Sequence, residues 1–258
     1  HNNTIADKGT AVGYNALKAN TEGASNTAVG HSALDANTTG SDNVAVGRDA
    51  LGANTTATLN TSVGNYSMLA SSSGGENAAF GAHTLKNNSD GQFNTALGTH
   101  ALRAATTADH NTAVGMSAMY LTTTGINNTA VGSEALYSNT TGFQNVAIGR
   151  QALGACTDGD SNTAVGYQAA QDLTGDGNTA VGHSSMMDAT TGSWNTAYGE
   201  RSLRDNTSGT QNVALGSSAL INNESGSYNS AICREALQGN TTASYNTAVG
   251  RAALYSQS

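Results

Sequence analysis

The residue types that carry most enzyme chemistry are sparse in this 258-residue chain and spread along its whole length. Of its six histidines, His31 and His183 share one place in a 17-residue sequence repeat, while His83, His100 and His110 do not share it, and the histidines are distributed over many copies. A catalytic or metal-binding histidine cluster needs several such side chains close together in space. A polysaccharide-cleaving enzyme would need two acids facing each other, and no such pair stands out. We therefore predict that the chain is not an enzyme and has no catalytic residues.

Three aspartates form the one constellation that would suit a metal ion. Asp160 and Asp176 stand in the same slot in front of consecutive repeat copies, and Asp158 is close by. If the copies stack, these carboxylates lie about 5 Å apart and repel each other, and a calcium ion would relieve that repulsion. The simpler interpretation is a solvated acidic loop. Calcium at Asp158, Asp160 and Asp176 is the one cofactor hypothesis; otherwise we expect none.

Bulky aromatic residues near the ends of several copies are the candidates for contacts with a receptor. They are Phe93, Phe143, Trp194, Tyr228 and Tyr245. Exposed aromatic side chains are common contact residues in protein interfaces. Further aromatic and basic residues share another slot: Tyr14, Tyr167, Arg48, Arg150, Arg234 and Arg251. The alternative is that the aromatic side chains pack on the neighbouring copy or on another subunit.

These residues are carried by a repeat whose clearest part is Asn26-Thr27-Ala28-Val29-Gly30. Its copies start near residues 9, 26, 43, 60, 77, 94, 111, 128, 145, 162, 178, 195, 212, 229 and 246, and one step, from 162 to 178, is 16 residues instead of 17. A fixed period predicts a solenoid, in which each copy forms one coil and contacts its neighbours. We expect a single elongated all-β domain over residues 1–258, a parallel β-roll of 15 coils.

Each coil is numbered here from its Asn as position zero. Thr, Ala and Val occupy positions one to three before a Gly, and Ala and Leu follow at positions seven and eight. Short segments of this kind between turn residues predict two strands per coil. Strand alternation then places Ala and Gly on one face of the first strand and Thr and Val on the other. In the second strand, Ala and Leu should point in opposite directions.

The recurring Asn and Gly residues have structural explanations. Stacked coils place Asn above Asn, and stacked amides form ladders. The predicted structural ladder comprises Asn26, Asn43, Asn60, Asn94, Asn111, Asn145, Gly30, Gly47, Gly115 and Gly149. The sequences at Asn37, Asn54, Asn139 and Asn240 match a glycosylation sequon, but they are more simply turns.

The two cysteines and the two apolar columns give further expectations. Cys156 and Cys233 lie five coils apart, too far for a disulfide, so both should be free thiols, with Cys233 tight in a Gly slot. A thin coil lined by Ala and Gly cannot enclose both the Val and the Leu of each copy. One apolar column should therefore lie outside, where soluble proteins normally cover such a patch. Another copy of the chain in a closed cyclic assembly is the simplest cover.

Composition limits the partners. The net charge of −8 without a basic stripe argues against nucleic acid, and no apolar run has membrane-spanning length. The chain begins at His1 without a signal peptide, so we expect a mature or excised piece of a longer protein. An extracellular, cell-surface or virion location fits these features.

Asn145-Val146-Ala147-Ile148-Gly149 resembles the head repeat of YadA-like trimeric autotransporter adhesins, and the frame 128–142 is similar to repeats in phage tail fibres. The resemblance covers essentially the whole chain. It implies a left-handed parallel β-roll, a homotrimer, and a structural or adhesive role, with a host-surface glycan or protein as receptor. The coil here is longer than the usual adhesin coil, and no neck, coiled coil or anchor is present in this sequence.

Two other functions suit the same repeat. Regular Thr columns at positions one and twelve are compatible with an ice- or surface-binding solenoid that acts as a monomer. Open ends without an obvious cap are compatible with a self-polymerising filament subunit.

Overall fold

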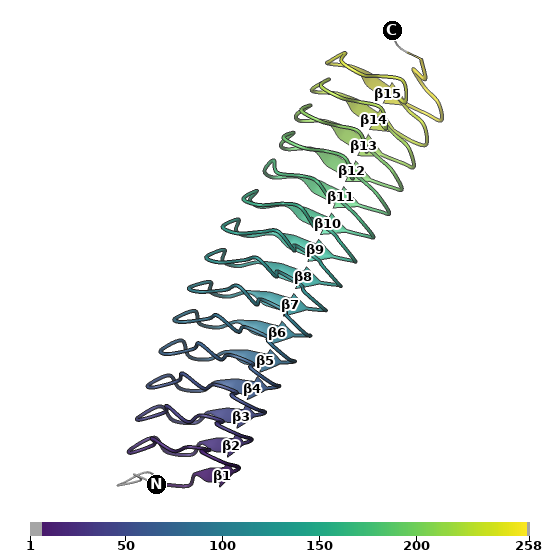
Figure 1. The fold of residues 1–258 in the computed structure, drawn as a ribbon. Helices are drawn as coiled ribbons and strands as arrows, with labels where there is room; N and C mark the ends of the chain where they lie inside the picture. Colours follow the sequence, from purple (N-terminus) through teal and green to yellow (C-terminus); the bar gives the residue numbers. More distant parts are fainter. Residues whose placement is uncertain (1–6, 257–258) are drawn as a thin grey trace. The chain divides into compact units, whose positions relative to one another are not determined.

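The structure is a computed structural model that describes residues 7–256 of the chain. It divides into two compact units, His1–Asn128 and Thr129–Ser258, and each unit is a stack of similar coils (Figure 1). The expectation of a single domain over residues 1–258 stays a prediction.

Every coil contributes one three-residue strand, and the described residues contain no helix. The first unit holds β1 (Thr10–Val12), β2 (Thr27–Val29), β3 (Val44–Val46), β4 (Thr61–Val63), β5 (Ala78–Phe80), β6 (Thr95–Leu97) and β7 (Thr112–Val114). The second holds β8 (Thr129–Val131), β9 (Val146–Ile148), β10 (Thr163–Val165), β11 (Thr179–Val181), β12 (Thr196–Tyr198), β13 (Val213–Leu215), β14 (Ser230–Ile232) and β15 (Thr247–Val249).

Within each unit, consecutive strands pair in parallel, and each residue lies opposite the same position of the next coil. Ala28 of β2 faces Ala45 of β3, for example, and Ala164 of β10 faces Ala180 of β11 across the 16-residue step. The prediction of an all-β parallel solenoid with a 17-residue spacing is therefore confirmed.

The Gly at position four is required by the close approach of consecutive coils. Gly47 has a φ of 135°, and a Cβ built on it would lie 2.5 Å from the carbonyl oxygen of Gly64 in the next coil. Neither the backbone angle nor the space admits a side chain. Cys233 occupies this slot with a φ of 94°, well away from the 127–141° of the glycines, and its side chain points to solvent. The backbone there has shifted to accommodate the Cβ, as the expected tight fit requires.

The prediction of a second strand at positions seven and eight is wrong. In the third coil, Asp49 and Leu51 have φ values of 52° and 51°, so the segment alternates between left- and right-handed conformations and forms turns. The N–H of Ala50 donates to the Gly47 carbonyl, and the N–H of Asn54 donates to the Leu51 carbonyl. Because the chain is not extended, Ala50 and Leu51 both point inward and are fully buried. The column of Leu and Met at position eight is thus the core of each unit.

The Asn at position zero ties each coil to itself and to the coil before it. The Asn43 amide group donates to the Ala57 carbonyl of its own coil at 2.8 Å. Its backbone N–H donates to Asn26 Oδ1 at 3.0 Å. The other Asn residues predicted for this ladder are equally buried and carry bonds of the same type: Asn60, Asn94, Asn111 and Asn145. Buried amides are stable only when bonded in this way.

A second Asn ladder, at position eleven, was not foreseen. Asn37 donates through Nδ2 both to Asn20 Oδ1 of the preceding coil, at 2.7 Å, and to the carbonyl of Gly40, at 2.9 Å. The four sequon asparagines belong to this buried column: Asn37, Asn54, Asn139 and Asn240. Their burial makes them inaccessible to glycosylation in the folded chain and supports their interpretation as turn residues.

The second ladder is interrupted where another residue replaces Asn. Ala105 follows Asn88, Ser71 follows Asn54, and Cys156 follows Asn139. In each case the Oδ1 of the preceding Asn is buried without a hydrogen-bond partner. The missing donor is the Nδ2 that an Asn in the next coil would supply.

Completing the ladder should therefore stabilise the fold. Ala105→Asn supplies a donor to Asn88 Oδ1, and we expect a gain of about 1 kcal/mol, since a buried acceptor regains its partner. The measurement is the shift of the urea midpoint of unfolding. Ala105→Leu is the matched control, because Leu173 already occupies the same slot in another coil but offers no donor. Equal midpoints for the Asn and Leu variants would contradict this account.

Candidate functional site

The outward face of the strands is the most regular surface of each unit. Ala at position two is buried, while positions one and three point to solvent. The large side chains at position three that are most exposed, between 38% and 66%, are Val12, Phe80, Leu97, Val131, Ile148, Tyr198, Leu215, Ile232 and Val249. Of the two apolar columns in the sequence, the Val column is therefore the one left outside.

The aromatic residues proposed as receptor contacts are all exposed, and most of them also pack along the stack. Phe93 stacks on His110 of the next coil, with ring centroids 4.7 Å apart, and Tyr228 stacks on Tyr245 at 4.9 Å. Contact with a neighbouring coil, the alternative explanation, therefore holds for these four rings. The structure leaves their edges accessible.

Trp194 rests on a notch made by Gly177. This glycine ends the 16-residue coil, and a Cβ built on it would lie 2.5 Å from the Trp194 ring. The indole is 64% exposed, so one part of the ring covers the coil while the rest faces solvent. Phe143 lies one position earlier in its coil than the other four candidates.

The second set of candidate contacts also pairs along the stack. Tyr14 lies against His31 at 5.3 Å, and Tyr167 against His183 at 5.4 Å, with the Arg150 guanidinium 5.8 Å from the Tyr167 ring. The remaining members are exposed, and two of them, Arg48 and Arg234, each form an ion pair with the acidic residue that follows it.

The three candidate calcium ligands have hydrogen bonds of their own. Asp160 Oδ1 accepts the N–H of Phe143, and Asp176 Oδ1 accepts the N–H of Asp160, both at 2.9 Å. Asp158 accepts from the hydroxyl of Thr157. Asp and Ser at this position fulfil the same role elsewhere, as Ser193 does for the N–H of Asp176. In the described part of the chain, no group of three His, Cys, Asp or Glu side chains is placed to hold a metal, and calcium stays a hypothesis.

Apart from His31 and His183, the histidines were expected to occupy unrelated slots, and this is wrong for one pair. His83 and His100 share position six in adjacent coils, and their rings are 5.3 Å apart. Tyr66 stacks on His83 at 5.2 Å from the other side. The signal was present in the sequence, because Tyr66, His83 and His100 are each 17 residues apart, as are Lys86, Arg103 and Tyr120.

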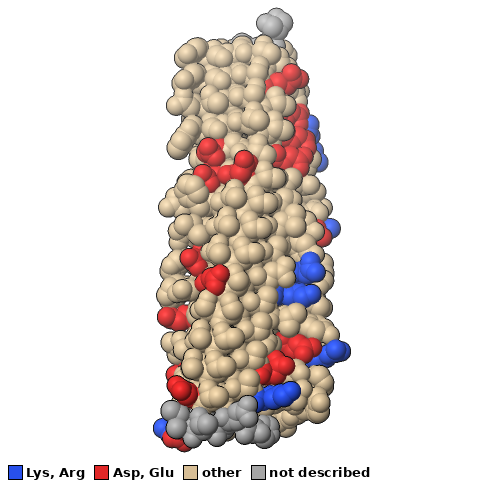
Figure 2. Space-filling model, turned by 60° about the vertical axis from the view of Figure 1, so that its left-hand side comes forward, with Lys and Arg blue, Asp and Glu red and all other residues tan. Residues whose placement is uncertain are grey.

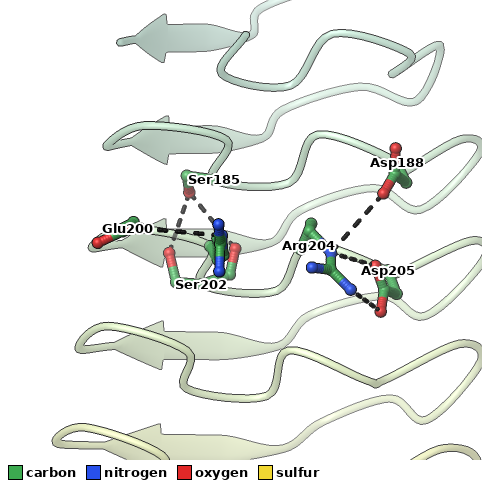
Figure 3. Close-up of polar contacts among 7 residues, drawn as sticks. Ser185, Asp188, Glu200, Ser202, Arg204 and Asp205 are labelled. Atoms are coloured by element: carbon green, nitrogen blue, oxygen red, sulfur yellow. Dashed lines mark hydrogen bonds and ion pairs between the residues drawn. The ribbon is translucent and has the colours of Figure 1, made fainter. Parts of the chain in front are cut away.

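An ion-pair network in the second unit also follows the stack (Figure 3). Arg204 Nε lies 2.6 Å from Asp205 and 3.7 Å from Asp188 in the preceding coil. Partial burial and the neighbouring carboxylates of Asp205 and Asp172 raise the pKa of Asp188, and Arg204 opposes this shift. These groups are partly solvated, and such pairs contribute little to stability.

Both cysteines are free, as predicted from their separation. Cys156 is buried in the Asn column, and burial raises the pKa of its thiol to about 12. A thiol with this pKa is protonated at neutral pH and is not a nucleophile there.

The face drawn in Figure 2 consists mostly of uncharged side chains, with the charged ones in small groups. Among the described residues, no helix is long and apolar enough to cross a membrane. Comparison with protein-family models and with curated proteins found no match for this chain.

The seating of Trp194 gives a direct test of this geometry. Most other coils carry a non-glycine residue with positive φ at the Gly177 position, so the backbone tolerates a side chain and the indole ring is the obstacle. Gly177→Ala should displace Trp194, the single tryptophan of the chain, and shift its fluorescence emission to longer wavelength. Ser161→Ala, one coil earlier at the same position, is the control and should leave the emission unchanged. An unshifted spectrum for Gly177→Ala would show that the ring does not rest there.

Proposed function

We propose that the chain is a segment of an extracellular fibre, of the kind found in surface adhesins and phage tail fibres, in which chains associate through the outward strand face. Its location would be a cell surface or a virion. The YadA-like character of the repeat sequence supports three chains per fibre and an adhesive role. Packed side chains fill the interior of each unit, so we expect the role of the repeat to be mainly mechanical.

The observation that carries this proposal is the exposed apolar column at position three. In the first unit, Phe80 and Leu97 lie side by side on adjacent strands with more than two fifths of their surface exposed. The core is already filled by Ala at positions two and seven and by Leu or Met at position eight, so these side chains have no place inside. Covering them removes apolar surface from water at about 25 cal/mol per Å². A second and third copy of the same column provide a matching surface in closed symmetry.

Charged residues in the column should break the assembly. The triple variant Leu97→Asp, Val131→Asp and Leu215→Asp places carboxylates on the proposed interface. Light scattering should give three chain masses for the wild type and one for the variant, because a buried unpaired charge costs several kcal/mol.

The control places the same three charges at position five of the same coils, with Thr99→Asp, Ser133→Asp and Ser217→Asp, and should keep the wild-type mass. A wild type that is monomeric at micromolar concentration would refute the proposal. A mass that grows with concentration would favour the filament instead.

One observation favours a second candidate, a monomeric ice-binding surface. Positions one and three form two parallel, in-register columns on the same outward face, with Thr at position one in most coils and an apolar residue at position three. The strand spacing repeats them about every 4.8 Å. If the chain is a monomer, we expect thermal hysteresis in a nanolitre osmometer, and Thr112→Lys should reduce it, because the longer side chain disrupts the flat face. A monomer without hysteresis would exclude this candidate as well.

A further inference from the structure

One strip of the first unit is basic although the chain as a whole is acidic. It comprises positions five to ten of four consecutive coils: residues 65–70, 82–87, 99–104 and 116–121. These residues include Lys86, Arg103, His83 and His100 and not one Asp or Glu, in a chain whose net charge is −8. The corresponding positions of the second unit carry both signs, as in the Arg204 network.

The side chains of this basic strip form one continuous stack. The Arg48 guanidinium, from the preceding coil, lies 5.3 Å from the Tyr66 ring, which stacks on His83. His100 follows and meets Tyr120 edge to face at 5.9 Å. Arg103 lies over the same Tyr120 ring and donates from Nη1 to its hydroxyl at 2.6 Å. These contacts hold the two histidines and Arg103 in place before any ligand arrives.

The positive charges of the basic strip are not neutralised within the described residues. None of the ion pairs found between residues 7 and 256 involves His83, Lys86, His100 or Arg103. Two buried atoms in the stack, His83 Nδ1 and Arg103 Nε, have no hydrogen-bond partner. Like charges held together without a counter-ion repel each other, and an anion placed across them would be stabilised.

We propose that the basic strip binds an acidic polysaccharide, through Lys86, Arg103 and the two histidines. The proposal deepens the adhesive function and rests on it. The two coils that carry the basic side chains are one strand spacing apart, about 4.8 Å, which suits neighbouring anionic groups of a sugar chain. The basic side chains lie on two adjacent coils of the strip, His83 with Lys86 on one and His100 with Arg103 on the next. Neighbouring sulfate or carboxylate groups of a linear ligand would therefore meet one pair and then the other.

The stacking favours a polysaccharide over a single-stranded nucleic acid. Single-strand binders offer free aromatic faces on which bases stack. Here Arg48 and His83 cover the two faces of Tyr66, and the four rings contact one another in series. What remains accessible is ring edges and cationic groups, which suit a polymer that has anionic groups but no aromatic rings.

Binding should strengthen as the pH falls. Partial burial lowers the pKa of His83, and the neighbouring Lys86, His100 and Arg103 lower it further. The groups that face it are Lys86, His100, Arg103 and the Tyr66 ring. A bound anion opposes the lowering, so ligand binding and protonation of His83 favour each other. The affinity should therefore be higher at about pH 5 than at about pH 7.5.

Binding of the full chain to immobilised heparin, measured in low salt on a biosensor, tests the proposal. We expect the wild type to bind and Lys86→Gln with Arg103→Gln to bind about tenfold more weakly. The matched control, Arg201→Gln with Arg234→Gln, removes two exposed charges from the second unit and should bind as the wild type does. His83→Gln with His100→Gln should remove the pH dependence.

Several outcomes would overturn the proposal. The first is that the wild type does not bind heparin. The second is that Lys86→Gln with Arg103→Gln and Arg201→Gln with Arg234→Gln lose equal amounts of heparin affinity. The third is that a single-stranded oligonucleotide at equal charge concentration displaces heparin. Light scattering on the Lys86 and Arg103 variant separates this proposal from the fibre proposal, since the assembly should keep its mass. Loss of heparin binding with unchanged mass supports both, and absent binding by a wild-type trimer refutes only the polysaccharide site.

Discussion

The structure depends on one constraint: consecutive coils within a unit stack in register at the spacing of paired strands. Backbone N–H groups of one coil donate to carbonyls of its neighbour at nearly every position, as when Thr27 donates to Asn43 and Gly47 to Val29, both at 2.8 Å. At this spacing, every side chain meets the equivalent side chain of the coil above and below. Gly at position four is the strictest consequence, because there the two backbones leave no room for a Cβ.

The same constraint decides which residue types can form a column. An amide carries both a donor and an acceptor, so Asn43 can bond to Asn26 and to its own coil at once. Carboxylates repel when stacked, and the fold offsets this by giving Asp160 and Asp176 a backbone N–H each. Aromatic rings stack readily at about 5 Å, as Tyr228 and Tyr245 do. In the basic strip, aromatic rings lie beside the basic groups, but none of the ion pairs found in the described residues neutralises them, and for this reason we propose it as a binding surface.

Stacking also maintains backbone conformations that an isolated segment would not hold. Leu51 and Asp49 adopt left-handed angles that are uncommon for residues other than glycine. The hydrogen bond from the Leu51 N–H to the Ser67 carbonyl of the next coil and the burial of its side chain compensate for this cost. The turn is therefore stabilised by the neighbouring coils, and the array must contain enough coils to supply these contacts.

The sequence by itself determined the period, the coil boundaries, the parallel pairing and the faces of the first strand, because each follows from a residue type that recurs every 17 positions. It also predicted the stacked ladder at Asn26 and separated the two cysteines. Only the tertiary structure decided that Ala50 and Leu51 both point inward, since left-handed angles at Leu are set by contacts between coils and not by local preference. That in turn left the position-three column outside. The meeting of His83 with His100, and the pairing of Arg103 with Tyr120, were likewise decided by the register of neighbouring coils, because spacing in the sequence places residues in a column without fixing how their side chains orient.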